Sequence, residues 1–242
     1  MTDAFARPSP RLDRALLVAR IVHDGAVRKG TAIPYIEHPV AVARILEAHG
    51  YGEDVVAAGL LHDTVEDAKY GSGEFQARLS AVAGRERLPS PSDAWAFRGR
   101  FLDFLRDEFG ANVYGLVMAV TEQKNDGGRQ LDWLERKKDQ LEHLAMAPPE
   151  AAALKAADTL HNITSTLEDV RRLGLGVLDR FRGGPLTVWH YAAVAQLAAG
   201  RLPAGDPLAR AVTDAAAQFL ATVRGLRPAP TQRPPYPEPT IY

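Results

Sequence analysis

Apolar residues recur along most of the chain at the three- and four-residue spacing of helices that bury one face. In RLDRALLVARIVHDGAVRK this spacing predicts a first helix over about residues 11–29. It predicts further helices over about 38–50, 52–68, 74–82, 99–109, 111–122, 131–146, 149–173, 187–199 and 207–224. We find no convincing run of alternating apolar and polar residues that would indicate a strand. The sequence therefore predicts an all-α fold, a bundle of helices.

Glycine and proline interrupt this helical pattern. TAIPYIE reads as an extended loop because Pro34 disfavours helix in the residue before it, and KNDGGR reads as a turn. Residues 69–100 mix Gly, Pro and Ser with short apolar pieces, which indicates an inserted loop with one short helix. We expect a helical core over 1–173, a C-terminal helical extension packed on it over 174–226, and a proline-rich tail over 227–242.

Composition narrows the class of protein. The chain has 242 residues, and its net charge of −1 argues against a generic nucleic-acid binder, which would be basic. It has no cysteine, so disulfides and a thiolate nucleophile are excluded. The N-terminal segment lacks the apolar core of a signal peptide, and the apolar stretches are too short to cross a bilayer. We expect a cytoplasmic protein without membrane or nucleic-acid partners.

Two histidines and two carboxylates stand out as candidate chemistry. His62 and Asp63 are adjacent in LLHDTVED, His38 lies upstream in PYIEHP, and Asp158 lies downstream in LKAADTLHN. Two imidazoles and two carboxylates suffice for a divalent metal site of the kind that activates water for phosphate chemistry. The four residues together predict a metal-dependent hydrolase.

A second acidic pair follows His62 and Asp63 on the same predicted helix. His62 and Glu66 are four residues apart, as are Asp63 and Asp67, so all four should leave one sector of the helix. Four ionisable groups on an otherwise apolar helix are costly unless a metal, water or ligand satisfies them. This sector therefore predicts a functional site.

Each of these residues also has a plainer interpretation when taken alone. A His-Asp pair on a helix is usually polar surface or a cap, and this chain has a second pair, His23-Asp24, in which His23 is at best a pocket wall. His38 alone is more often an ordinary loop histidine. Asp158 alone is compatible with an ordinary buried hydrogen bond, although Asn162 repeats the four-residue spacing after it. Only the joint pattern favours a metal site.

Five segments resemble RelA/SpoT-type hydrolase domains in type and order. They are RKGTAIPYIEHPVAVARIL, AAGLLHDTVED, VMAVTEQK, ERKKDQ and LKAADTLHN, which together span roughly residues 11–170. The chain looks most like the stand-alone small alarmone hydrolases, which include a metazoan SpoT homologue. Those are all-helical HD-domain enzymes that remove the 3′-pyrophosphate from (p)ppGpp with Mn²⁺.

The resemblance implies a role for each matching residue. It implies metal ligation by His38, His62, Asp63 and Asp158. It implies catalysis by the acidic pair Glu66 and Asp67. It implies nucleotide contacts by Arg28, Lys29, Asn162 and Ser165. The plainer interpretation of Arg28 and Lys29 is favourable charge at a helix C-terminus. We read three further basic residues as solvated helix charges: Arg136, Lys137 and Lys155.

The chain departs from the family pattern in places, and several functions stay open. RKGTAIPYI differs from the usual RKSGxPYI by a residue, Thr164 replaces a common Arg, and residues 69–100 are longer than usual. The nearest alternative is hydrolysis of the adenosine alarmone (p)ppApp. A nucleotidase or an NADPH phosphatase is a more distant alternative. A catalytically silent alarmone sensor is a further alternative. A purely structural helical protein would leave the carboxylates unexplained. The oligomeric state is open.

Overall fold

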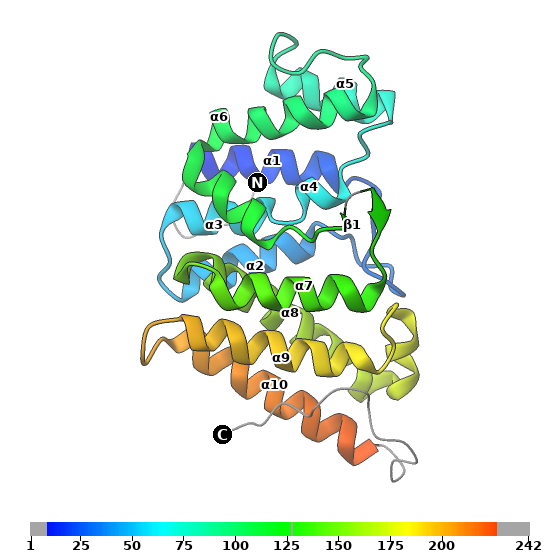
Figure 1. Ribbon diagram of the computed structural model, residues 1–242, viewed down its shortest axis with the longest axis vertical. Helices are drawn as coiled ribbons and strands as arrows, with labels where there is room; N and C mark the ends of the chain where they lie inside the picture. The colour runs from blue at the N-terminus through cyan, green and yellow to red at the C-terminus, as the bar shows by residue number, and fades with distance from the viewer. Residues whose placement is uncertain (1–8, 127, 227–242) are drawn as a thin grey trace. The chain divides into compact units, whose positions relative to one another are not determined.

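A computed structural model describes residues 9–126 and 128–226, and most of them are helical (Figure 1). The all-α prediction is confirmed, since the strands described are a two-residue antiparallel pair, β1 (Asn125–Asp126) and β2 (Arg129–Gln130). The described residues divide into two compact units, unit 1 with residues 9–28 and 32–121, and unit 2 with 29–31, 122–126 and 128–226. The predicted proline-rich tail, 227–242, lies outside the described residues, and the predicted division after residue 173 stays a prediction.

Unit 1 is built around a short buried helix. Its helices are α1 (Pro10–Val22), α2 (Glu37–Ala48), α3 (Glu53–Leu61), α4 (Thr64–Asp67), α5 (Gly73–Ala83) and α6 (Ala94–Val120). Helices α1, α2 and α6 all pack on α3, and α1 also packs on α5. Every residue of α3 from Val55 to Leu61 is buried, as its nearly continuous apolar sequence predicts.

The first helix is shorter than predicted, because the chain folds back on itself after Val22. The N–H of Arg28 donates to the carbonyl of Ile33, and the N–H of Tyr35 donates to the carbonyl of Ala26, both at 2.8 Å. These bonds close residues 26–35 into a narrow loop. The prediction of helix from 23 to 29 is therefore wrong, and it failed because cross-loop bonds replace the helical ones.

The helix predicted across residues 52–68 is also wrong, because it breaks at the His62-Asp63 pair. Two side chains satisfy carbonyls of the last turn of α3: His62 Nδ1 lies 2.8 Å from the carbonyl oxygen of Gly59, and the hydroxyl of Thr64 donates to that of Leu61 at 2.6 Å. The φ and ψ of Asp63, −94° and −4°, interrupt the helix before α4. His62 and Asp63 therefore lie at a bend.

The inserted segment contains the short helix that the sequence predicts, α5. Its buried Gln76 closes the loop that follows: the amide donates to the carbonyls of Tyr70 and Ser92, each at 2.7 Å, and accepts from the N–H of Ser92. Helix α6 begins at Ala94, five residues before the prediction, because the Asp93 side chain caps it. The two predicted helices 99–109 and 111–122 meet at Gly110, where the backbone leaves helical geometry.

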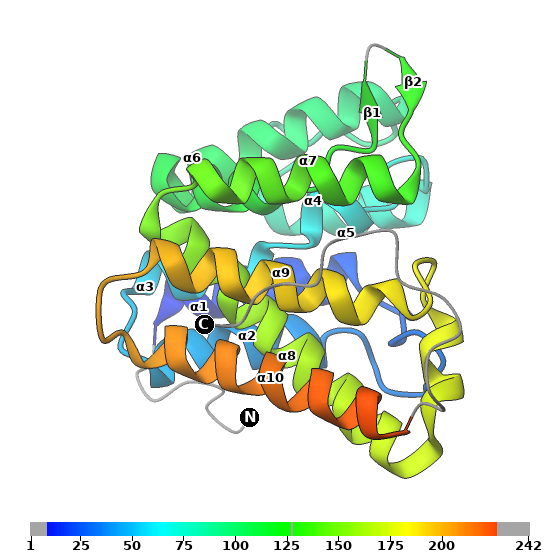
Figure 2. The ribbon, with the colours of Figure 1, turned by 60° about the horizontal axis from the view of Figure 1, so that its bottom comes forward.

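Unit 2 contains the remaining helices. They are α7 (Trp133–Met146), α8 (Pro149–Leu173), the 3₁₀ helix η1 (Leu175–Arg180), α9 (Leu186–Arg201) and α10 (Pro207–Leu226). Helices α8, α9 and α10 pack on one another (Figure 2). The N-terminal half of α8 is rich in buried alanine, and such small side chains let helices approach closely. The sequence predicts the bounds of α8 but not η1, which is too short to show a period.

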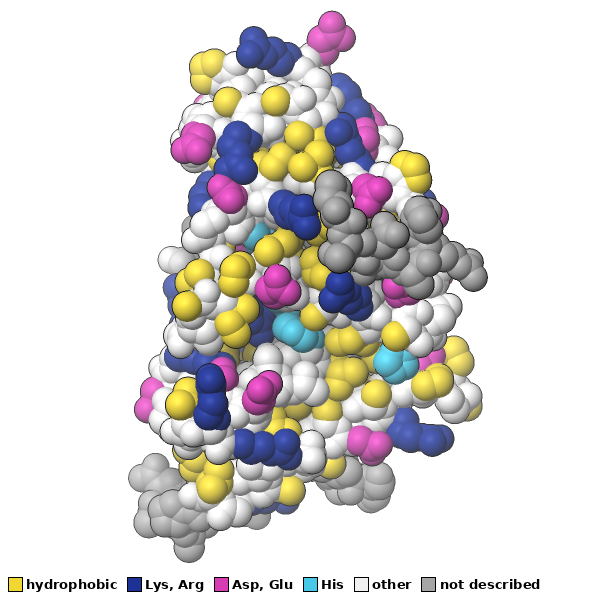
Figure 3. Space-filling model, turned by 180° about the vertical axis from the view of Figure 1, so that it is seen from behind, with side chains coloured by type: hydrophobic (Ala, Val, Ile, Leu, Met, Phe, Trp, Pro, Cys, Tyr) yellow, Lys and Arg dark blue, Asp and Glu magenta, His cyan; other side chains and the backbone are white. Residues whose placement is uncertain are grey.

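The surface mixes charges of both signs. On the face drawn in Figure 3, Lys and Arg side chains are interspersed with Asp and Glu side chains. This fits the net charge of −1. In the described part of the chain, no helix combines the length and the apolarity that crossing a bilayer requires.

Candidate metal centre

Two buried histidines of unit 1 lie side by side because α2 and α3 pack unusually closely. His38 is in the first turn of α2, and His62 directly follows α3. A Cβ added to Gly59 of α3 would lie 3.1 Å from the Cα of Ala43 and 2.9 Å from a methyl of Leu46, both in α2. Glycine at 59 therefore permits the approach that brings the His38 and His62 rings to a centroid distance of 5.1 Å, edge to face.

The hydrogen bond of His62 to the backbone fixes which ring nitrogen can bind a metal. Its Nδ1 lies 2.8 Å from the carbonyl oxygen of Gly59, and a carbonyl only accepts, so Nδ1 carries the hydrogen. Nε2 then carries a lone pair, which is the usual arrangement of a metal-binding histidine. Asp63 Oδ2 lies 3.2 Å from His62 Nε2 and 3.6 Å from His38 Nε2. Three potential ligand atoms thus converge within unit 1.

Tyr35 holds the Asp63 carboxylate from the other side. Its hydroxyl donates to Asp63 Oδ2 at 2.7 Å, and its ring meets the His38 ring edge to face. A hydrogen bond of this kind fixes the direction of a carboxylate. The sequence analysis missed Tyr35, although it lies in the PYIEHP segment, three residues before His38.

The carboxylate of Asp158, in unit 2, is fixed by its own helix. Asp158 is buried, Lys155 Nζ donates to its Oδ2 at 2.8 Å, and the Asn162 amide donates to its Oδ1 at 2.6 Å. The interpretation of Lys155 as a solvated charge is wrong, because its side chain is only 14% exposed and pairs with Asp158. Partners on either side along α8 therefore set the direction of this carboxylate.

Arg136 and Lys137 are not solvated charges either. Both form ion pairs with Glu122, whose side chain is only 8% exposed. Burial raises the pKa of the Glu122 carboxyl, but Lys137 and Arg136 outweigh burial and hold that pKa below its usual range. The sequence alone could not show this, because Glu122 precedes its partners by 14 and 15 residues.

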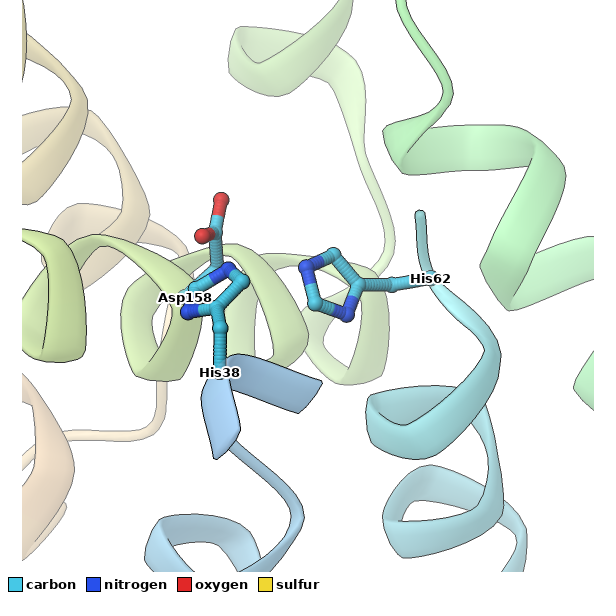
Figure 4. Close-up of side chains that lie close together, drawn as sticks. All are labelled: His38, His62 and Asp158. Atoms are coloured by element: carbon cyan, nitrogen blue, oxygen red, sulfur yellow. The ribbon is translucent and has the colours of Figure 1, made fainter. Parts of the chain in front are cut away.

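A group of three buried residues offers the ligand atoms that a divalent cation needs. They are His38 and His62 of unit 1 and Asp158 of unit 2, and Figure 4 draws their side chains. Imidazole nitrogens with a carboxylate oxygen are a common donor set for divalent metals. The group therefore suggests a divalent metal site.

A known protein family matches part of unit 1. Residues 15–84 match the HD domain family. This segment, less than a third of the chain, is similar to HD domains. The matched segment includes His38, His62, Asp63, Glu66 and Asp67, so most of the residues singled out in the sequence lie in it.

Curated relatives match a larger share of the chain than the family model does. The chain is 35% identical over 132 residues to the mouse protein named guanosine-3′,5′-bis(diphosphate) 3′-pyrophosphohydrolase MESH1, covering 54% of each chain. It is 30% identical over 238 residues to a GTP pyrophosphokinase of Streptomyces coelicolor, covering 88% of this chain and 24% of the relative. The chain thus spans about half of the first relative and about a quarter of the second.

Solved structures share the fold. A structure described as that of a metazoan ortholog of SpoT that hydrolyzes ppGpp is 25% identical, with a TM-score of 0.61 over 92% of this chain and all of that one. A Listeria monocytogenes protein is 28% identical, with a TM-score of 0.55 over 76% of this chain and 99% of that one. The helical fold of this chain therefore occurs in other proteins of related sequence.

The predicted acidic pair lies in the short helix α4. Glu66 is half-buried and Asp67 is exposed, and their backbone N–H groups both donate to the carbonyl of Asp63, at 3.2 and 3.0 Å. The pair therefore follows directly from the bend that carries Asp63. In unit 1 the structure brings Asp67 near a buried histidine, since His23 Nδ1 lies 3.7 Å from its Oδ2.

The predicted substrate contacts lie in different local settings. The Arg28 guanidinium carbon lies 5.9 Å from the centroid of the Tyr35 ring, while Lys29 is exposed. The Ser165 hydroxyl donates to the backbone carbonyl of His161 at 2.8 Å. The Asn162 amide holds Asp158, which is a positioning role that the sequence analysis did not assign to it. The nucleotide contacts of these four residues stay predictions.

Proposed function

We propose that the chain is a metal-dependent hydrolase that removes the 3′-pyrophosphate of guanosine 3′,5′-bis(diphosphate) or its triphosphate form, giving GDP or GTP and pyrophosphate. The observation that carries the proposal is a pair of buried histidine rings with the Asp63 carboxylate close to both, in a segment that is similar to HD domains. The name of the mouse relative, a guanosine-3′,5′-bis(diphosphate) 3′-pyrophosphohydrolase, supports this substrate and this cleaved bond.

We propose four metal ligands, His38, His62, Asp63 and Asp158, and Mn²⁺ as the metal. Three observations support the set: the 5.1 Å between the ring centroids of His38 and His62, the lone pair on His62 Nε2, and the approach of Asp63 Oδ2 to both rings. Asp158 adds a buried carboxylate in unit 2. A divalent cation held there would acidify a water and offset the charge of the phosphates. Hard carboxylate oxygens in the donor set are compatible with Mn²⁺.

The other predicted residues supply proton transfer and charge. Glu66, aided by Asp67, would take a proton from the attacking water or give one to the leaving 3′-oxygen. Arg28 and Lys29 would offset negative charge on the nucleotide or stack on its base. Asn162 and Ser165 would contact the ribose and phosphates, Asn162 while it holds Asp158.

A product assay tests the proposed function. The protein is incubated with ppGpp, ppApp, NADPH or deoxynucleotides in Mn²⁺, beside an EDTA control, and products are separated by chromatography. We expect GDP and pyrophosphate from ppGpp, and no turnover in EDTA. Pyrophosphate released faster from ppApp would reassign the base. Orthophosphate as the product would make the chain a phosphatase, and nucleotide binding without turnover would make it a silent sensor.

The proposed proton-transfer role of Glu66 gives a sharper prediction. We expect Glu66→Gln to fold and to bind Mn²⁺ as the parent does, while kcat falls by about 100-fold or more, the usual contribution of a general acid or base. The matched control is Glu86→Gln, which changes an exposed glutamate of the inserted segment and should leave kcat unchanged. An unchanged kcat in Glu66→Gln would reject the role.

A further inference from the structure

His23 is a buried residue of unit 1 that the proposed chemistry does not use. It directly follows α1 and is 3% exposed. Among the described residues, neither of its ring nitrogens has a hydrogen-bond partner. Buried polar groups are nearly always paired, so a histidine left in this state calls for a functional explanation. The sequence analysis took His23 for a pocket wall at best.

Two groups of the candidate site face the His23 ring. One face lies against Tyr35, with ring centroids 4.8 Å apart, and Tyr35 in turn donates to Asp63. On another side Nδ1 lies 3.7 Å from Oδ2 of Asp67. His23 thus lies between a residue that holds a proposed metal ligand and one member of the proposed acidic pair.

Because the His23 ring is uncharged at neutral pH, it can donate a hydrogen bond to a carboxylate but cannot form an ion pair with it. Burial lowers the pKa of His23 to about 4, although the nearby Asp63 carboxylate acts in the opposite direction. At neutral pH the ring is therefore uncharged and carries one N–H. An uncharged donor can orient a carboxylate while leaving it basic enough to accept a proton.

We infer that His23 is a positioning residue that orients the Asp67 carboxylate for proton transfer, which rests on the hydrolytic function proposed above. The 3.7 Å between Nδ1 and Oδ2 is longer than a direct hydrogen bond. A small rotation of either side chain brings the two atoms within hydrogen-bond distance. The Tyr35 ring, tilted by 36° at a centroid distance of 4.8 Å, packs against the His23 ring and limits its rotation, and the same tyrosine donates to Asp63.

The inserted segment braces this arrangement. Lys69, two residues after Asp67, donates to the backbone carbonyl of Asp24 at 3.2 Å. Arg78 of α5 forms an ion pair with the side chain of the same aspartate. Both contacts tie the turn that follows His23 to the segment that follows α4.

Two variants of His23 separate a positioning role from a packing role. His23→Phe keeps the ring volume against Tyr35 but removes both nitrogens, and His23→Gln restores an N–H donor. With ppGpp and Mn²⁺, we expect His23→Phe to lower kcat by about 10- to 100-fold with KM and Mn²⁺ affinity unchanged. His23→Gln should recover part of that loss. An unchanged kcat in His23→Phe, with a melting temperature at or above that of the parent, would overturn the inference.

A double-mutant cycle tests whether His23 acts through Asp67. If it does, adding His23→Phe to Asp67→Asn should slow the enzyme no further than Asp67→Asn alone. Multiplicative effects of the two substitutions would overturn the inference.

An activity-free readout separates this inference from the proposed function. In ¹⁵N spectra of the full-length protein, the His23 ring resonances should shift on Asp67→Asn and stay in place on the exposed control Asp103→Asn. Should the parent hydrolyse no ppGpp, the proposed function fails, and this spectrum still decides whether the His23–Asp67 contact exists. His23 resonances that ignore Asp67→Asn would rule the contact out.

Discussion

The Oδ2 atom of Asp63 lies near three groups at once, the two histidine Nε2 atoms and the Tyr35 hydroxyl. We expect Asp63→Asn to weaken Mn²⁺ binding by more than about 100-fold, because the loss of a ligand should exceed the 10- to 100-fold cost of losing an outer partner. Turnover should be lost with the metal. Metal titration measures the effect, with the exposed Asp103→Asn as a control. Parental Mn²⁺ affinity in Asp63→Asn would remove Asp63 from the ligand set.

The sequence indicated the ionisable residues of the site but not the residues that orient them. His38, His62 and Asp63 were found because their types and order form a recognisable pattern. Tyr35 and Lys155 act on carboxylates through side-chain directions that only the folded chain defines. A tyrosine and a lysine also occur on most surfaces, so their types alone carry little information.

At the scale of helices, the contact between α2 and α3 depends on one position without a side chain. We expect Gly59→Ala to lower the free energy of unfolding by about 1–3 kcal/mol, the usual cost of overpacking, because the new methyl meets the backbone of Ala43. Mn²⁺ affinity should fall as well, since the helices that carry His38 and His62 must separate. Urea unfolding and metal titration measure both effects.

A matched glycine tests the interpretation of this contact. Gly99 of α6 has open space around it, so Gly99→Ala should not destabilise the protein. Should Gly59→Ala keep both the stability and the Mn²⁺ affinity of the parent, close packing of α2 on α3 would not be what positions the histidines.

Helix α6 provides two glycines whose replacement should have opposite effects. Gly110 has φ of 88° and ψ of 162°, which a residue with a side chain adopts only under strain, so Gly110→Ala should cost about 1–3 kcal/mol. Gly115 is helical with open space, so Gly115→Ala should add about 0.5–1 kcal/mol. Chemical unfolding of the two variants decides the matter, and equal effects would contradict a break at Gly110.

The sequence predicts the position of a helix where apolar residues repeat with the helical period. It does not predict the end of a helix where hydrogen bonds from side chains to the backbone determine that end. The bounds of α8 were predicted because Pro149 and Gly174 flank a regular apolar stripe. The break between α3 and α4 was missed, since it depends on hydrogen bonds from His62 and Thr64 to the last turn. The apolar pattern runs through that bend without interruption.

At the scale of the whole molecule, buried neutral histidines make stability depend on pH. Burial lowers the pKa of His190, on α9, well below its usual value, and its Nε2 pairs with Gln140 at 3.1 Å. Below pH 6.5 the unfolded chain binds a proton that folded His190 excludes. The free energy of unfolding should therefore fall as pH drops below 6.5, by up to about 1.4 kcal/mol per pH unit for this residue. Above pH 6.5 the contribution is constant.

Replacing His190 should reduce that pH dependence. Urea unfolding between pH 5 and 7.5 should show a shallower slope for His190→Asn than for the parent. At pH 7.5 the variant should also be less stable, because it loses the bond to Gln140 and leaves a cavity. Replacing the exposed His143 of α7 in the same way should not lower stability at pH 7.5. Identical slopes in His190→Asn and the parent would show that His190 is not neutral when folded.

Two side chains that donate to Asp158 belong to the helix that carries it, three residues before and four residues after. These hydrogen bonds hold the Asp158 side chain in one rotamer relative to the backbone of α8. When α8 rotates about its axis or shifts along it, the carboxylate therefore moves together with the helix backbone. A substitution that twists α8 would thus redirect the Asp158 carboxylate, which is one of the proposed ligands, without replacing any residue of the proposed site.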